Sequence, residues 1–132
     1  MSKPASEPSA LRIFLVENHS DTLKWLTLYL EQMGHHVTSA QSVSGALETL
    51  PGGAWDVFIS DIGLPDGDGW ELLQQANLPD DVYTIAMSGF GMNADRLRSK
   101  SVGYRHHMLK PFNPDELDGL LEEAAREMAT QR

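Results

Sequence analysis

Four separated polar segments follow apolar stretches of the chain, and their side chains could together handle a phosphoryl group. They are Glu17-Asn18, Asp61, Ser88 and Lys110. Two nearby carboxylates repel each other unless a cation lies between them, and Mg²⁺ prefers hard oxygen ligands. An aspartate beside such an ion can act as a nucleophile toward phosphorus. The hydroxyl and the ammonium would then contact the equatorial phosphoryl oxygens, where phosphoryl transfer needs charge neutralisation.

These polar residues stand where predicted strands end. Short apolar runs predict strands over residues 12–16, 36–40, 55–60, 82–87 and 104–109. Helical spacing of apolar residues predicts helices over 21–33 and 42–50, from Trp70 to Ala76, and over 93–100 and 114–128. Gly34 is placed to end the first helix, and Asn113-Pro114 to begin the last.

Five strands that alternate with five helices predict an α/β fold with one doubly wound parallel sheet. Such a five-stranded sheet commonly has the strand order 2-1-3-4-5, with its ligand crevice where the order reverses, between the first and third strands. Glu17 and Asp61 are therefore expected to face each other across that crevice, with Ser88 and Lys110 on the same rim.

Length and composition limit the possible functions. With 132 residues, the chain is expected to form one domain over 11–128, a flexible tail over 1–10 and a short C-terminal tail over 129–132. A net charge of −9 argues against direct nucleic-acid binding, and the absence of cysteine excludes disulfides and thiol catalysis. No apolar run is long enough for a membrane span, and we expect a cytoplasmic protein.

The chain resembles the response-regulator receiver family of two-component signalling, which has a flavodoxin-like fold. The resemblance covers residues 11–128 and lies in IFLVEN at 13–18, VFISDIGLPDGDG at 57–69, AMSG at 86–89 and KPF at 110–112. It implies that a histidine kinase or phosphotransfer protein phosphorylates Asp61, and that Ser88 and Lys110 contact the phosphoryl oxygens. It also implies a cis peptide before Pro111, which fits the restriction of cis bonds to X-Pro.

The resemblance further implies a magnesium site and a docking surface. The ligands would be Glu17, Asn18, Asp61 and the backbone carbonyl of Gly63. A downstream effector would dock on the fourth helix, the final strand and the last helix. The chemistry would be limited to self-phosphorylation from a phosphohistidine donor and autodephosphorylation, so a metabolic enzyme is not expected.

Two positions depart from the common pattern of the family. Asn18 stands where the family usually has a second acidic residue, and we expect weaker Mg²⁺ binding from an uncharged amide. His107 stands where the family often has Tyr or Phe, as a ring that moves when the nearby hydroxyl moves. As the switch residue, an imidazole would add sensitivity to pH near neutrality.

Two other functions are compatible with parts of the sequence. Asn18 supports a degenerate receiver that acts as a protein-interaction module without phosphorylation. A flavodoxin-like binder of flavin mononucleotide is disfavoured, because the turn over residues 17–20 is acidic, whereas a phosphate-binding loop there should be rich in Gly, Ser and Thr. Asp66 and Asp68 do not have the spacing of an EF-hand calcium loop and are expected to be turn residues.

Overall fold

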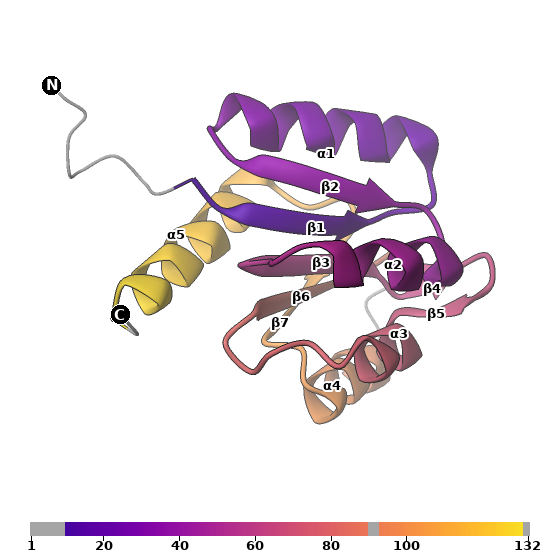
Figure 1. Ribbon diagram of the computed structural model, residues 1–132. Helices are drawn as coiled ribbons and strands as arrows, with labels where there is room; N and C mark the ends of the chain where they lie inside the picture. Colours follow the sequence, from indigo (N-terminus) through magenta and orange to yellow (C-terminus); the bar gives the residue numbers. More distant parts are fainter. Residues whose placement is uncertain (1–9, 90–92, 131–132) are drawn as a thin grey trace, which may run out of the picture.

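Five parallel strands form the central sheet in a computed structural model that describes residues 10–89 and 93–130 (Figure 1). The strands are β1 (Arg12–Val16), β2 (His36–Ala40), β3 (Val57–Asp61), β6 (Tyr83–Ser88) and β7 (His106–Leu109). They lie in the order β2-β1-β3-β6-β7, and every neighbouring pair is parallel. The predicted α/β class and the 2-1-3-4-5 order are therefore confirmed.

Helices cover both faces of the sheet (Figure 1). On one face, α1 (Ser20–Gln32) and α5 (Pro114–Thr130) pack with the inward residues of the strands. On the other face lie α2 (Val43–Thr49), α3 (Gly69–Ala76) and α4 (Asn93–Val102). No helix in the described part of the chain has the length and apolar character needed to cross a bilayer.

The two central strands are buried on both faces, which explains why their sequences are continuous apolar runs. In β1, Ile13 and Leu15 point into the core under α1 and α5, whereas Phe14 points into the core under α2 and α3. Every residue of β3 is buried. Each fully buried side chain of this size contributes about 1.5–3 kcal/mol of transfer free energy, so these strands form a rigid base for the residues that follow them.

The loop after β3 attaches the helices of one face through two aspartates. The Asp66 carboxylate accepts hydrogen bonds from the backbone N–H groups of Val43 and Ser44, at 2.8 and 3.0 Å, at the start of α2. Asp68 is the N-cap of α3 and accepts from the Glu71 N–H at 2.8 Å. These carboxylates satisfy N–H groups that a helix start leaves without partners, so the loop is a structural connector.

Several element boundaries differ from those predicted. The third strand begins at Val57, although the Asp56 backbone also bonds to Arg12 and Tyr83, and its side chain accepts from the Arg12 N–H and guanidinium. The final strand begins at His106, since the Tyr104 ring turns into the core, where its hydroxyl donates to the Gly69 carbonyl at 2.6 Å.

The other differences extend predicted elements. The predicted loop after β3 contains a two-stranded hairpin of β4 (Gly63–Leu64) and β5 (Gly67–Asp68), and η1 (Leu50–Gly52) continues α2 as a 3₁₀ turn. α4 reaches Val102 and α5 reaches Thr130, two residues beyond the expected end of the domain. Nearly all of the expected N-terminal tail, residues 1–9, lies outside the described residues.

Candidate functional site

Three charged side chains from three strand ends meet at the C-terminal edge of the sheet. Glu17 follows β1, Asp61 ends β3 and Lys110 follows β7. The Lys110 Nζ atom lies 2.5 Å from Glu17 Oε1 and 2.6 Å from Asp61 Oδ1. Only 4% of Asp61 and none of Glu17 is exposed. The structure thus brings one cation and two buried carboxylates together from residues up to 93 positions apart.

The backbone around Asp61 is held by close contacts that fix the direction of its side chain. The Asp61 carbonyl accepts from the Ser60 hydroxyl at 2.8 Å, and the following N–H, of Ile62, bonds to the Met87 carbonyl at 2.9 Å. Gly69 packs directly against this strand end, since a Cβ atom there would lie 2.3 Å from the Asp61 carbonyl oxygen. Glycine is required at this position because the two backbones approach so closely.

The Lys110 side chain is placed by the end of β7. The Lys110 N–H donates to the Ser88 carbonyl at 2.8 Å, which continues the β6–β7 pairing by one bond. The following peptide bond, to Pro111, is cis, as the resemblance implied. The Lys110 ammonium lies at the ends of β1 and β3, where it contacts Glu17 and Asp61.

With both carboxylates ionised, the site has one more negative charge than positive charge. Burial and the neighbouring Glu17 carboxylate raise the pKa of Asp61 to about 7, although Lys110 opposes this shift. Burial also opposes ionisation of Glu17, but hydrogen bonds from its neighbours, including Lys110, hold its pKa below the usual value. Burial alone would lower the pKa of Lys110, but Asp61 and Glu17 raise it. One ammonium thus compensates about one of the two carboxylates.

The remaining negative charge and the available ligand atoms fit a divalent cation. Among the described residues, one group of His, Asp and Glu has the geometry to hold a metal: Glu17, His19 and Asp61, whose ligand atoms lie within 4.8 Å of one another. The site opens into a cavity of about 590 Å³ that is also lined by Asn18 and Gly63. Hard carboxylate oxygens beside an open cavity suit an ion such as Mg²⁺, which keeps several waters.

His19 is a candidate ligand that the sequence analysis did not assign. Its backbone N–H donates to Glu17 Oε2 at 3.0 Å, and its Nδ1 atom lies 3.4 Å from the same oxygen. The neighbouring Asn18 N–H makes a long contact of 3.4 Å with Asp61 Oδ2. The sequence could have indicated His19 as a candidate ligand, because it lies in the same turn after β1 as Glu17 and Asn18.

Ser88 and His107 form the other part of the site. The Ser88 Oγ atom lies 2.8 Å from His107 Nε2, and Ser88 lines the same cavity as Asp61 and Lys110. His107 is partly buried, and its Nδ1 atom lies 2.7 Å from the Ser99 hydroxyl of α4. The imidazole therefore points inward, toward the hydroxyl of the proposed phosphoryl-binding residue.

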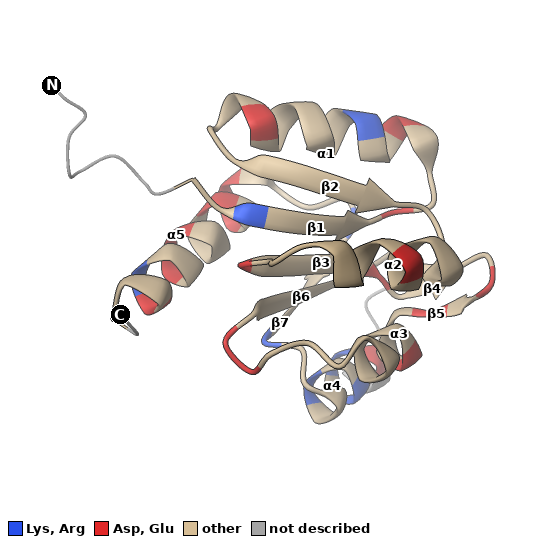
Figure 2. Cartoon of the chain, in the orientation of Figure 1, with Lys and Arg blue, Asp and Glu red and all other residues tan. Residues whose placement is uncertain are grey.

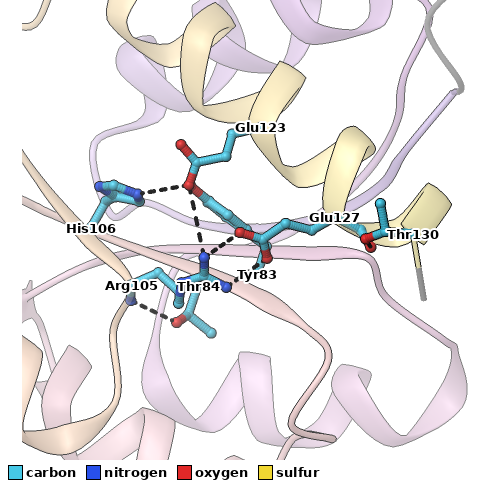
Figure 3. Close-up of polar contacts among 7 residues, drawn as sticks. All are labelled: Tyr83, Thr84, Arg105, His106, Glu123, Glu127 and Thr130. Atoms are coloured by element: carbon cyan, nitrogen blue, oxygen red, sulfur yellow. Dashed lines mark hydrogen bonds and ion pairs between the residues drawn. The ribbon is translucent and has the colours of Figure 1, made fainter.

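The surface expected to dock partners, on α4, β7 and α5, differs in charge from the chain as a whole. Figure 2 shows blue segments, which mark Lys and Arg residues, on α4. These residues are Arg96, Arg98 and Lys100, although the whole chain has a net charge of −9. Figure 3 shows that acidic residues of α5 point toward β6 and β7.

Those acidic residues make specific polar contacts. The Tyr83 hydroxyl donates to Glu123 at 2.7 Å, and both outer nitrogens of the Arg105 guanidinium donate to Glu127. The Arg105 guanidinium also lies over the Tyr83 ring, 4.7 Å from its centre. These contacts attach α5 to the N-terminal ends of β6 and β7, at the opposite end of the strands from Asp61 and Lys110.

Curated proteins are similar in sequence to most of the chain. The chain is 31% identical over 119 residues to the two-component response regulator ARR11 of Arabidopsis thaliana, covering 89% of this chain and 23% of that protein. It is 32% identical over 113 residues to the probable transcriptional regulator ycf29 of Porphyra purpurea, covering 83% of this chain and 54% of that protein. The chain thus spans only part of the length of these relatives.

Solved structures share the fold closely. A CheY-like response regulator receiver domain protein of Methanospirillum hungatei JF-1 superposes with a TM-score of 0.86 at 26% identity, covering 94% of this chain and all of that one. A response regulator of Burkholderia pseudomallei, solved with a phosphorylated aspartic acid and a calcium ion, has a TM-score of 0.80 over 92% of this chain and 72% of that one. At 19% identity, that second likeness bears on the fold alone.

The part of the chain that matches a family model includes nearly all of the sheet, the cluster of charged residues and about half of the last helix. Residues 13–122 match the family described as the response regulator receiver domain. This range includes every residue of the charged cluster and the Ser88–His107 pair. The chain belongs to the response regulator receiver domain family of two-component systems.

Proposed function

We propose that this chain is a phosphoacceptor receiver domain, in which Asp61 takes a phosphoryl group from the phosphohistidine of a partner kinase or phosphotransfer protein. The observation that carries the proposal is the Lys110 ammonium, which lies within 2.6 Å of both buried carboxylates. An ion pair that only stabilises the fold needs one carboxylate for the Lys110 ammonium. A second buried carboxylate lowers the stability of the fold, because it is desolvated and repelled by the first. Such a destabilising group is typical of a functional site.

Each side chain has a defined part in the transfer. An Asp61 carboxylate oxygen attacks phosphorus, so that an O–P bond forms while the N–P bond of the donor breaks. The Lys110 ammonium and the Ser88 hydroxyl neutralise and orient the equatorial oxygens. A bound Mg²⁺ would supply the remaining positive charge at those oxygens. Glu17, Asp61, Asn18 and the Gly63 carbonyl would hold it, and His19 is placed to assist.

The transfer requires an ionised Asp61. With the pKa of Asp61 raised to about 7 in the metal-free protein, a substantial part of the nucleophile is protonated at neutral pH. Bound Mg²⁺ favours the carboxylate form, so metal binding and nucleophile activation are coupled. Receiver domains interact with kinases and effector domains, and we place the effector contact of this chain on α4, β7 and α5, in the cytoplasm.

The test is incubation with acetyl phosphate and Mg²⁺, followed by intact-mass measurement. Wild-type protein is expected to gain one phosphoryl group, and Asp61→Asn none. Asp68→Asn is the matched control, because it removes a carboxylate from the same loop while asparagine still caps α3. The control should be modified like the wild type.

A second candidate is a receiver that binds partners without being phosphorylated. Asn18 favours it, because an uncharged side chain replaces a carboxylate that the family usually has there. If wild-type protein stays unmodified under conditions that modify another receiver domain, while Asn18→Asp becomes modified, this candidate replaces the first.

A further inference from the structure

The His19 ring lies beside Glu17 at the mouth of the charged site. Its Nδ1 atom lies 3.4 Å from Glu17 Oε2, and its side chain is 74% exposed, whereas the side chain of Glu17 is fully buried. His19 also lines the same cavity as Asp61 and Lys110. The imidazole therefore has access both to solvent and to the carboxylates of the site.

Lys110 contacts one oxygen of each buried carboxylate, and the other oxygen of each lies toward the turn that carries His19. The Lys110 Nζ atom contacts Glu17 Oε1 and Asp61 Oδ1. Glu17 Oε2 accepts from the His19 backbone N–H at 3.0 Å, and Asp61 Oδ2 makes a long contact of 3.4 Å with the Asn18 N–H. Because a carboxylate oxygen has two lone-pair sites, Oε2 and Oδ2 can still bind a cation.

The distances among these atoms suit ligands of one metal ion. Zn²⁺ binds imidazole nitrogen and carboxylate oxygen at about 2.0–2.2 Å, so two of its ligands at a tetrahedral angle lie about 3.4 Å apart. The His19 Nδ1 and Glu17 Oε2 atoms have this separation. One ligand atom each from Glu17, His19 and Asp61 lies within 4.8 Å of the others, and rotation of the exposed His19 ring can adjust its distances to both carboxylates.

The donor atoms differ from those of a site built for Mg²⁺ alone. Mg²⁺ prefers hard oxygen ligands and keeps several waters, so a nearby imidazole adds little to its binding. Zn²⁺ and similar first-row ions bind imidazole nitrogen well. Asn18, in the same turn, offers an uncharged amide, which adds no negative charge for Mg²⁺. One imidazole, two carboxylates and one amide therefore suit a borderline ion better than they suit Mg²⁺.

A purely structural role of His19 explains less of this arrangement. Its distance of 3.4 Å to Glu17 is longer than the usual N–H···O range of about 2.7–3.2 Å. The Glu17 carboxylate is already held by the Lys110 ammonium and by the His19 backbone N–H. As the N-cap of α1, His19 makes no capping hydrogen bond with its side chain. Neither role gives the imidazole a contact that the fold needs.

We propose that His19 is a metal ligand of this site, and that its imidazole raises the affinity for a borderline divalent cation of the Zn²⁺ class far more than the affinity for Mg²⁺. One such ion binds His19, Glu17 and Asp61 together, so Zn²⁺ and Mg²⁺ compete for the same two carboxylates. The inference rests on the function proposed above because it concerns the same site, but metal binding tests it without any phosphoryl transfer.

The first experiment measures the metal affinities of the full chain by calorimetry at neutral pH, with Zn²⁺ and Mg²⁺ titrated separately. His19→Gln should weaken Zn²⁺ binding about tenfold or more, since even the loss of a residue that only orients a ligand costs about 10–100-fold. Its effect on Mg²⁺ binding should be less than about threefold, because Mg²⁺ gains little from nitrogen ligands. Asp61→Asn should weaken the binding of both ions, which would place them at the same site.

His36→Gln is the matched control for a general loss of histidine. His36 is exposed and pairs with Arg12, at the opposite end of β1 from Glu17. Its replacement should change the affinity for neither ion. His19→Gln should leave the start of α1 intact, because the His19 side chain does not cap this helix.

The second experiment identifies the ligand by nitrogen-15 NMR of protein labelled at histidine. Zn²⁺ should shift a ring-nitrogen signal of His19, which is assigned by its absence in His19→Gln, and Mg²⁺ should leave this signal in place. The assignment is overturned by an unshifted His19 signal, by equal Zn²⁺ affinity in the wild type and His19→Gln, or by an equal loss of Mg²⁺ affinity in His19→Gln.

Failure of this inference and failure of the proposed function give different results. Phosphorylation of Asp61 with Mg²⁺, together with Zn²⁺ binding that does not depend on His19, would overturn the inference alone. Zn²⁺ binding that depends on His19, in a protein that takes up no phosphoryl group with Mg²⁺, would contradict the proposed function alone.

Discussion

Asp61 and Asp56 are equally buried carboxylates, each 4% exposed, yet their replacement by asparagine should change stability in opposite directions. Asp61 lies beside a second carboxylate, Glu17, and shares a single ammonium with it. Asp56 accepts hydrogen bonds from the backbone N–H and the guanidinium of Arg12, at 2.8 to 3.2 Å. In metal-free protein at pH 8, Asp61→Asn should stabilise the fold and Asp56→Asn should destabilise it.

The size of the stability change in Asp61→Asn follows from the pKa of Asp61. Folding raises this pKa from 3.8 to about 7, so the folded state binds the proton more tightly than the unfolded state. The wild type therefore loses stability as the pH rises from about 4 to about 7. Each pKa unit corresponds to about 1.4 kcal/mol, which gives an upper limit of about 4 kcal/mol at pH 8. Solvent at the rim of the cavity screens the charge, and we expect about 2 kcal/mol.

Urea denaturation in the presence of a chelator measures the free energy of unfolding of the wild type and both variants. The slopes of this free energy against urea concentration are compared to exclude changes in the unfolded state. The stabilisation by Asp61→Asn should be about 2 kcal/mol at pH 8, should fall to less than half of that at pH 5, and should approach zero only below about pH 4, where Asp61 is protonated in the unfolded state too. Asp56→Asn should cost about 1.5–3 kcal/mol at pH 8, the value of a charged hydrogen bond.

Adding Mg²⁺ should make the wild type more stable than Asp61→Asn. At one hundred times its dissociation constant, the ion should stabilise the wild type by about 2.7 kcal/mol and Asp61→Asn by much less. The reasoning is refuted if Asp61→Asn destabilises the metal-free protein at pH 8, or if its effect is the same at pH 5 and pH 8.

Three further changes test individual contacts. Asn18→Asp should tighten Mg²⁺ binding several-fold in a metal titration, because a third carboxylate joins the site; an unchanged affinity would exclude Asn18 from it. Gly69→Ala should cost about 1–3 kcal/mol in urea unfolding, since its Cβ would lie 2.3 Å from the Asp61 carbonyl oxygen, whereas Gly119→Ala, with open space around it, should not destabilise. Tyr104→Phe should cost about 1 kcal/mol through loss of the hydrogen bond to Gly69, and no loss would mean that water replaces it.

Local sequence patterns were enough to predict the five strands of the central sheet, the five α-helices and their order. The buried strands appear as continuous apolar runs because both faces are covered. Gly34 ends α1 with a φ of 99°, and the Asn113 side chain accepts from the Asp115 N–H at the start of α5. Such signals involve residues within a few positions of each other, so a sequence displays them directly.

The meeting of Glu17, Asp61 and Lys110 followed from the same patterns, because parallel strands bring their carboxyl ends to one edge. The strand boundaries did not follow. Residues 55 and 56 look like strand in the sequence, and the Asp56 backbone does bond to Arg12 and Tyr83, but the regular strand begins only at Val57, because strand ends depend on partners far away in the sequence. Asp66 and Asp68 were predicted as turn residues, and the folded chain uses them to cap two helices.

The hydrogen bonds that join Trp70, Ser99, His107 and Ser88 depended entirely on the packed structure. These residues share no motif or spacing, and only Ser88 and His107 were assigned a role from the sequence. Their hydrogen bonds arise because α3 and α4 pack on the same face of the sheet and α4 lies against β7. Side-chain contacts between elements depend on rotamers and on the distances between packed helices, and local periodicity does not encode these.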